Sequence, residues 1–110
     1  MTEPLNQEQL EAVMGLIVNA GNAKSDAMEA IQAAKKGDFE QAHEKLKAAE
    51  QALVEAHHSQ TSLLTDEASG KPMNITLLTV HSQDHLMTSI TFNDLAKEVV
   101  EIYERLAADE

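Results

Sequence analysis

His81, Asp84 and His85 are the residues of this chain whose types and spacing could do chemistry. In a helix His85 lies about 40° to one side of His81 and Asp84 about 60° to the other, so all three share one face. They interrupt an apolar stripe that runs from Leu78 to Phe92. Two imidazoles and a carboxylate can ligate a transition metal. Alternatively, one ring nitrogen can act as a nucleophile that accepts a phosphoryl group when a neighbour fixes its tautomer.

Residue chemistry alone leaves both readings open, although it excludes one common metal motif. The pattern is not H-E-x-x-H, because Ser82 stands where the glutamate belongs and the acid directly precedes the second histidine. A single histidine on an apolar stripe is usually a core residue, but two histidines with a carboxylate in one turn favour a functional site. His57 is a weaker candidate to line it.

Three long helices must position this cluster. Asn6 is expected to cap the first, with Gln9 completing a capping box, and Lys35, Lys36 and Gly37 to end it. Asp38 is expected to cap the second, and residues 67–74 to form the next turn. The third is predicted from about Ile75 to Leu106. Helices of about 30 residues joined by short turns predict an all-α, up-down-up three-helix bundle.

Apolar residues recur at helical spacing and define the expected contact faces. The first helix carries one stripe of larger residues from Leu10 to Ile31 and a second, mostly alanine stripe, which allows a neighbouring helix to approach closely. The third helix carries one continuous seam, which is expected to face the core: Leu78, His81, His85, Thr88, Phe92, Leu95, Val99, Ile102 and Leu106.

Gln60 is the polar interruption in the seam of the second helix. Counting back from the turn places it opposite Ser82, with both about 10 Å from the turn. The sequence therefore predicts a buried cluster of Gln60 with the two histidines and the aspartate, inside a wall of Leu10, Met14 and Met87.

Composition limits the function classes. The 110 residues predict a single domain, spanning 1–110, and the absence of cysteine excludes disulfide and thiolate chemistry. No apolar run reaches the roughly 18 residues of a membrane span, and residues 1–4 lack a basic signal region, so a cytoplasmic protein is expected. With 19 acidic against 8 basic residues, the net charge of −11 argues against nucleic acid and anionic membranes and is compatible with a basic protein partner.

The segment from Thr79 to Thr88 reads T-V-H-S-Q-D-H-L-M-T. It resembles the V-H-[AG]-Q-D-H-L-M-T segment of the IIA components of bacterial sugar phosphotransferase systems, in their lactose/cellobiose class. Residues 14–25 and the stretch from Glu55 to Thr61 are also similar to this family, and the likeness covers roughly residues 10 to 106.

The resemblance implies a homotrimer of three-helix subunits. The histidine matching His81 would take a phosphoryl group from phospho-HPr and pass it to the cysteine of the cognate IIB protein during sugar uptake. His85 and Gln60 match positions near that histidine. Asp84 matches an aspartate near the three-fold axis that binds a divalent cation, so the resemblance implies a magnesium ion shared by the three subunits. The segment at residues 14–25 favours a cellobiose or chitobiose transporter over a lactose one.

The sequence departs from the family pattern at two positions, and it leaves two other functions open. Ser82 stands where the family usually has Ala or Gly, and His58 where it commonly has another residue. One rival is a histidine phosphotransfer domain of a two-component relay, which typically shows H-x-x-K-G, whereas Ser82, Gln83 and Asp84 follow His81. The other is a non-enzymatic trimeric bundle that holds a buried metal.

Overall fold

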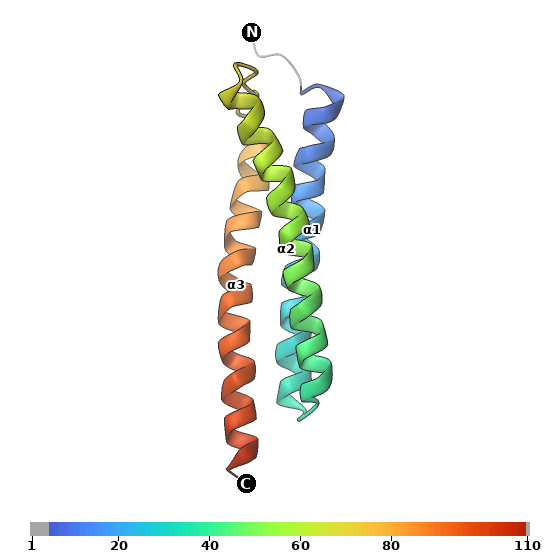
Figure 1. Ribbon diagram of the computed structural model, residues 1–110, viewed down its shortest axis with the longest axis vertical. Helices are drawn as coiled ribbons and strands as arrows, with labels where there is room; N and C mark the ends of the chain where they lie inside the picture. The colour runs from blue at the N-terminus through green and yellow to red at the C-terminus, as the bar shows by residue number, and fades with distance from the viewer. Residues whose placement is uncertain (1–4, 110) are drawn as a thin grey trace.

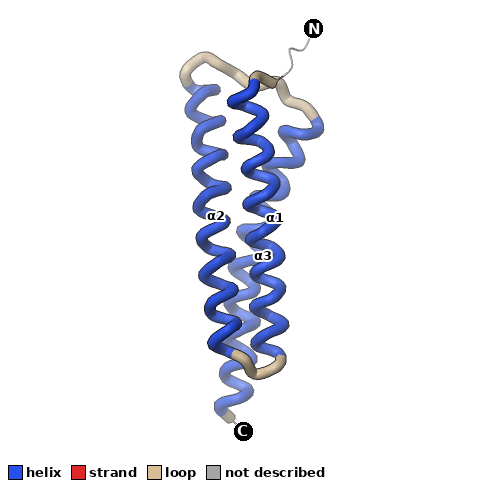
Figure 2. Tube along the Cα trace, turned by 90° about the vertical axis from the view of Figure 1, so that its right-hand side faces the viewer, coloured by secondary structure: helices blue, strands red, loops and turns tan. Residues whose placement is uncertain are grey.

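The chain folds into three antiparallel helices, as a computed structural model that describes residues 5–109 shows. The helices are α1 (Gln7–Lys35), α2 (Phe39–Ala68) and α3 (Leu77–Ala108). They form a rod of 63 × 20 × 18 Å (Figure 1), and the two turns lie at opposite ends (Figure 2). The predicted all-α, up-down-up bundle is confirmed. Residues 1–4, on which the expectation about a signal region was based, lie outside the described part.

The predicted caps form as expected. The side-chain oxygen of Asn6 accepts a hydrogen bond of 2.7 Å from the backbone N–H of Gln9, whose side chain accepts one of 3.2 Å in return. Asp38 caps α2 by accepting from the N–H of Gln41 at 3.1 Å. Gly37, between these helices, has a φ of 83°, which only glycine adopts without strain. Local side-chain chemistry therefore sets these helix ends.

The α3 helix begins two residues later than expected. Thr76 is its cap: the backbone N–H of Thr76 donates to the hydroxyl of Thr79 at 2.7 Å, and the N–H of Thr79 donates to the hydroxyl of Thr76 at 3.2 Å. Ile75 is 85 % exposed and lies before the helix. The apolar pattern extended through Ile75, but the threonine pair fixes the true start.

The core is built from the small stripe of α1. The buried residues of α1 are Val13, Leu16, Ala20, Ala23, Ala27, Ala30 and Ala34. Alanines bring helix backbones close together, and α1 packs against both other helices more extensively than these pack against each other. On α2 the buried residues are those of its predicted seam: Ala42, Leu46, Ala49, Ala56 and Leu63.

The predicted core face of α3 is wrong for the single chain. Its buried residues are Thr79, Ser82, Leu86, Ser89, Asn93, Ala96 and Val100. On the predicted seam, Leu95, Ile102 and Leu106 are 60 %, 56 % and 57 % exposed. The physical reason is the alanine stripe of α1, which brings α3 close and favours a face made mostly of small side chains. The face with larger apolar residues is left on the surface.

The buried face of α3 carries two polar atoms without a hydrogen-bond partner among residues 5–109: the Ser89 hydroxyl and the Asn93 carbonyl oxygen. An unpaired buried hydroxyl costs about 1–3 kcal/mol. We therefore expect Ser89→Ala to raise the free energy of unfolding by about 1 kcal/mol, measured by urea denaturation. Ser82→Ala is the matched control, because the Ser82 hydroxyl donates to the Thr79 carbonyl at 2.7 Å. Equal or lower stability of Ser89→Ala than of the parent would contradict this expectation.

Ion pairs join the helices on the surface. Lys45 on α2 contacts Glu29 on α1 at 3.1 Å, and the hydrogen bond to that carboxylate raises the pKa of the Lys45 ammonium. His43 contacts Glu104 of α3 at 3.1 Å. Such exposed pairs contribute little stability, so packing holds the bundle together. Within residues 5–109, no helix combines the length and apolar character that crossing a membrane requires.

Candidate functional site

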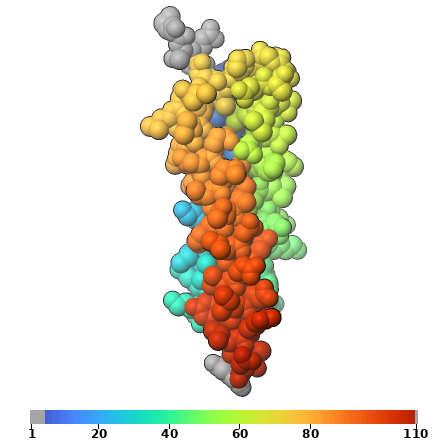
Figure 3. Space-filling model, turned by 90° about the vertical axis from the view of Figure 1, so that its left-hand side faces the viewer, coloured from blue at the N-terminus to red at the C-terminus, as the bar shows by residue number. Residues whose placement is uncertain are grey.

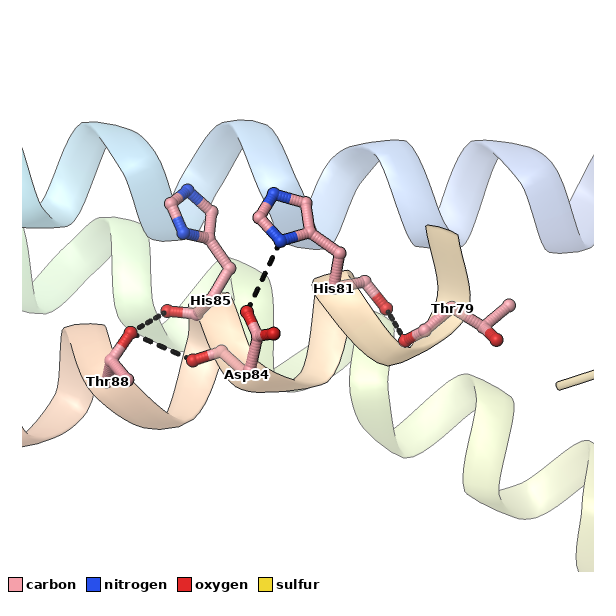
Figure 4. A network of polar contacts seen from close by, with 6 residues as sticks. Thr79, His81, Asp84, His85 and Thr88 are labelled. Carbon is pink, nitrogen blue, oxygen red and sulfur yellow. Dashed lines mark hydrogen bonds and ion pairs between the residues drawn. The ribbon is translucent and has the colours of Figure 1, made fainter. Parts of the chain in front are cut away.

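The structure brings His81, Asp84 and His85 together on one face of α3, as their spacing predicts. Asp84 Oδ1 lies 3.3 Å from His81 Nδ1 (Figure 4). The rings of His81 and His85 stack, with centroids 5.3 Å apart and planes 23° from parallel. Both rings project toward α1 (Figure 4). The His81 ring is therefore held at one nitrogen by a carboxylate and on one face by a second imidazole.

Regular helix geometry supports this cluster. The Thr88 hydroxyl donates to the carbonyl oxygens of Asp84 and His85, at 2.8 and 3.3 Å, one turn away. Ser82 is fully buried, and its hydroxyl donates to the backbone of its own helix. The hydroxyl that departs from the family pattern is thus satisfied within α3 and does not disturb the histidine face.

The expectation that this cluster is buried is wrong for a single chain. The side chains of His81 and Asp84 are 54 % and 61 % exposed. The expected apolar wall is also exposed, with Leu10, Met14 and Met87 at 37 %, 44 % and 55 %. The cause is the same rotation of α3 about its own axis, which points its small residues toward the core. The consequence is that the free edge of the His81 ring is open to a protein partner.

Gln60 does not meet the histidines within the chain. Its side-chain N–H donates to the side-chain oxygen of Gln83 at 2.7 Å. The counting along the turn was correct to one residue, but Gln83 points about 200° around the helix from His81. The sequence analysis did not identify Gln83 as the partner of Gln60, although Gln83 lies in the segment from Thr79 to Thr88 that resembles the family. The expected contact of Gln60 with His81 is therefore absent from the described chain.

Gln60 and Gln83 instead line a groove between α2 and α3. The groove has a volume of about 280 Å³ and lies near the turn that joins these helices. In Figure 3 it is a hollow between the yellow and orange parts of the surface. Its apolar lining includes Leu64, Ile75 and Val80. The other histidines of α2 lie elsewhere: His57 and His58 are exposed, and His43 pairs with Glu104.

The described part of a single chain brings together no cluster of metal ligands. Among residues 5–109 there is no group of three histidine, cysteine, aspartate or glutamate side chains placed to share an ion. Asp84 is the carboxylate of the histidine cluster, and one of its oxygens already faces His81. A magnesium ion takes several oxygen ligands, so Asp84 alone does not fit it.

Comparison with known proteins decides the family. The sequence model of the family described as "PTS system, Lactose/Cellobiose specific IIA subunit" matches residues 11–104. This chain belongs to that family. The match covers all three helices and the histidine cluster on α3, and it favours this assignment over a two-component phosphotransfer domain or a non-enzymatic metal bundle.

Relatives of this IIA chain carry related descriptions. The lichenan-specific phosphotransferase enzyme IIA component of Bacillus subtilis is 47 % identical over 102 residues, covering 93 % of both chains. The cellobiose-specific EIIA component of Lactococcus lactis is 49 % identical over 105 residues, covering 96 % of this chain and 90 % of its own.

Solved structures show the same fold. The crystal structure of the cellobiose-specific enzyme IIA of Bacillus anthracis has a TM-score of 0.92 and 42 % identity, covering 97 % of each chain. The IIA(Chitobiose) of Escherichia coli, solved in complex with HPr, has a TM-score of 0.80 and 42 % identity, covering 93 % of this chain and 99 % of its own. This IIA chain is thus a phosphotransferase component of a sugar transport system.

Proposed function

We propose that His81 accepts a phosphoryl group from phospho-HPr and passes it to the cysteine of a cognate IIB protein. The observation that carries this proposal is the contact between His81 Nδ1 and Asp84, in a ring whose side chain is 54 % exposed. A histidine that must react with two successive protein partners needs both an oriented ring and an open edge. The test is reconstitution with phosphoenolpyruvate, enzyme I and HPr, with acid-labile phosphate on this chain as the readout.

The Asp84 contact supports Nε2 of His81 as the reacting atom. A carboxylate 3.3 Å from Nδ1 favours the tautomer with the proton on that nitrogen, which leaves the lone pair of the neutral ring on Nε2. Nε2 attacks the phosphorus, the N–P bond forms, and the bond from phosphorus to HPr breaks with its electron pair staying on HPr. The ring then carries a positive charge with the proton still on Nδ1, which Asp84 stabilises. Attack by the IIB cysteine reverses these changes.

The expected partners fit the charge of the chain. A relative of this chain has been solved in complex with HPr, and this chain carries a net charge of −11. Opposite charge on a donor speeds encounter without requiring a large interface. We place this exchange in the cytoplasm, and we expect neither nucleic-acid binding nor membrane insertion.

The sugar proposed is a β-linked disaccharide of the cellobiose or chitobiose type. Relatives described as specific for lichenan and cellobiose are 47 % and 49 % identical to this chain. A IIA subunit touches HPr and IIB rather than sugar, so the preference enters through the choice of IIB. Transfer to a panel of IIB proteins therefore tests it.

We also propose that the chain assembles as a homotrimer. The exposed face of α3 carries Leu95, Ile102 and Leu106, and the adjacent face of α1 carries Met14 and Met28 at 44 % and 45 % exposure. On α3 the apolar part of this face runs from Phe92 to Leu106, a length of about 20 Å at helical rise. A contiguous apolar surface of this length marks an interface in a protein of this size.

Sedimentation equilibrium at micromolar concentration is expected to give three times the chain mass. Leu95→Glu should shift the protein toward monomer, because it would place a charge on the apolar seam. Val54→Glu is the matched control: Val54 is 49 % exposed on α2, away from this seam, and the variant should remain trimeric. A monomeric parent would refute the trimer.

A divalent cation, magnesium by preference, is proposed to lie between copies of Asp84. One chain offers a single carboxylate there, whereas three copies around an axis would offer three. Oxygen ligands alone favour a hard ion such as Mg²⁺ over zinc. Its role would be structural, and the phosphoryl transfer described above does not pass through it.

A further inference from the structure

We infer that Gly21 of α1 is a positioning residue for the phosphoryl acceptor. This inference rests on the proposed role of His81. A side chain at Gly21 would meet the site directly: a Cβ built there lies 3.4 Å from Nε2 of His85. Because the His85 ring in turn stacks on His81, a residue on α1 acts on the reacting ring through one intermediate side chain.

The backbone conformation at position 21 does not require a glycine. Positive φ values occur among residues 5–109 only at Gly37 and Gly70, so Gly21 has ordinary helical geometry. In such a position alanine is ordinarily favoured over glycine. What the missing side chain supplies is therefore space, and the group that uses this space is the imidazole of His85.

The contacts form a chain across the groove between α1 and α3. The edge of the His85 ring rests against α1 at Gly21, and the ring stacks on His81 with centroids 5.3 Å apart. The opposite support of the His81 ring is Asp84, at 3.3 Å from Nδ1 (Figure 4). The Cβ of an alanine at position 21 would only touch the ring, but a residue larger than alanine would displace His85 and remove one of these two supports. The direction of Nε2 would then be less well defined.

The test is a graded series of substitutions. Gly21→Ala brings a methyl group into van der Waals contact with His85, and the rate of phosphoryl uptake from phospho-HPr should fall a few-fold. Gly21→Val adds two methyl groups, and the rate should fall by on the order of 10- to 100-fold, as for a misplaced reacting group. The loss should appear in kcat with little change in the KM for phospho-HPr, because the binding surface is retained.

Gly15 offers the matched control. It lies on the same helix, and a Cβ there would lie 3.3 Å from the Ser59 hydroxyl rather than from the histidines. Gly15→Ala and Gly15→Val therefore carry the same helix effects and at least as much steric strain, taken up by Ser59, and they should leave the uptake rate near that of the parent. If the Gly15 and Gly21 variants slow uptake equally, the effect is general destabilisation and the inference is wrong.

A double-mutant cycle and a spectrum separate the positioning role from folding. In a His85→Ala background, Gly21→Val should cause no further loss, because the ring it displaces is gone. Long-range ¹H–¹⁵N spectra of the parent should show one dominant His81 tautomer, with the proton on Nδ1, and Gly21→Val should show a mixture. An additive cycle or an unchanged tautomer overturns the inference. Labelling of His81→Ala would instead refute the proposed function, so the two failures are distinguishable.

Discussion

We expect His81→Ala to take up no phosphate from phospho-HPr, whereas the parent should be labelled fully in the same reaction. This is the largest effect expected for any single substitution, because the variant removes the atom to which the phosphorus would bond. No neighbour replaces it: Nε2 of His85 faces α1 at Gly21, while the open edge of the cluster is the His81 ring, whose side chain is 54 % exposed.

His85→Ala is expected to behave differently from His81→Ala. It keeps the acceptor nitrogen and the Asp84 contact but loses the stacked ring. Uptake should persist at a rate lower by on the order of 10- to 100-fold. The measurement is acid-labile phosphate on the purified chain after reconstitution, sampled over time so that rate and final extent are separated.

His43→Ala is the control for losing any histidine. His43 is exposed on α2, and its side chain contacts Glu104 rather than the histidine cluster of α3. It should be labelled like the parent. If His81→Ala is labelled to the same extent as the parent, another residue carries the phosphoryl group and the central proposal is wrong.

The parts of the fold that sequence predicted are those fixed by short-range chemistry. Asn6 with Gln9, and Asp38 with Gln41, satisfy free backbone groups within one turn, so their effect is local and readable. The grouping of His81, Asp84 and His85 is local for the same reason. Their spacing on one helix fixes their common face before any tertiary contact forms.

Which face of α3 is buried depends on tertiary contacts, and the prediction made from the sequence was wrong. α3 has two faces that can be buried, and periodicity favours the one with larger apolar residues, from Leu78 to Leu106. The choice depends on the alanines of α1, which favour the mostly small face from Thr79 to Val100. The apolar periodicity of one chain is the same for a helix face that packs in the core and for one that packs against another subunit, because both faces exclude water.

Gln60 shows how a small error in register changes a site. Counting along the turn placed it opposite Ser82, and its actual partner is Gln83. One residue corresponds to a rotation of about 100°, which carries the contact to the side of α3 away from His81. The position of a contact along the axis of a bundle is thus easier to predict from sequence than the side of the helix on which the contact lies.

Asp84→Leu tests two roles that the same side chain is proposed to hold. One oxygen lies 3.3 Å from Nδ1 of His81 and is proposed to orient the ring, while in a trimer the carboxylates of three copies would share a cation. Losing the first role should slow phosphoryl uptake by on the order of 10- to 100-fold without abolishing it, because Nε2 remains. Losing the second should remove the metal but not the assembly, because apolar replacements of buried charged clusters are often neutral or stabilising.

Asp84→Asn separates the two roles. The amide oxygen can still accept the proton of Nδ1, so uptake should stay closer to that of the parent than in Asp84→Leu. A neutral amide binds a hard cation weakly, so both variants should lose the ion. Thermal melts with and without a strong chelator give the readout: the parent should melt at a lower temperature with chelator, and both variants should melt identically in either condition.

Each outcome assigns Asp84 differently. If the parent melts at the same temperature with and without chelator, no cation stabilises the assembly and Asp84 serves His81 alone. If Asp84→Leu dissociates into monomers on sedimentation, the apolar seam alone does not hold the trimer, and the expectation that assembly survives the loss of Asp84 is wrong. If instead Asp84→Leu takes up phosphate as fast as the parent, the 3.3 Å contact does not orient the ring, and the assignment of Nε2 as the nucleophile loses its support.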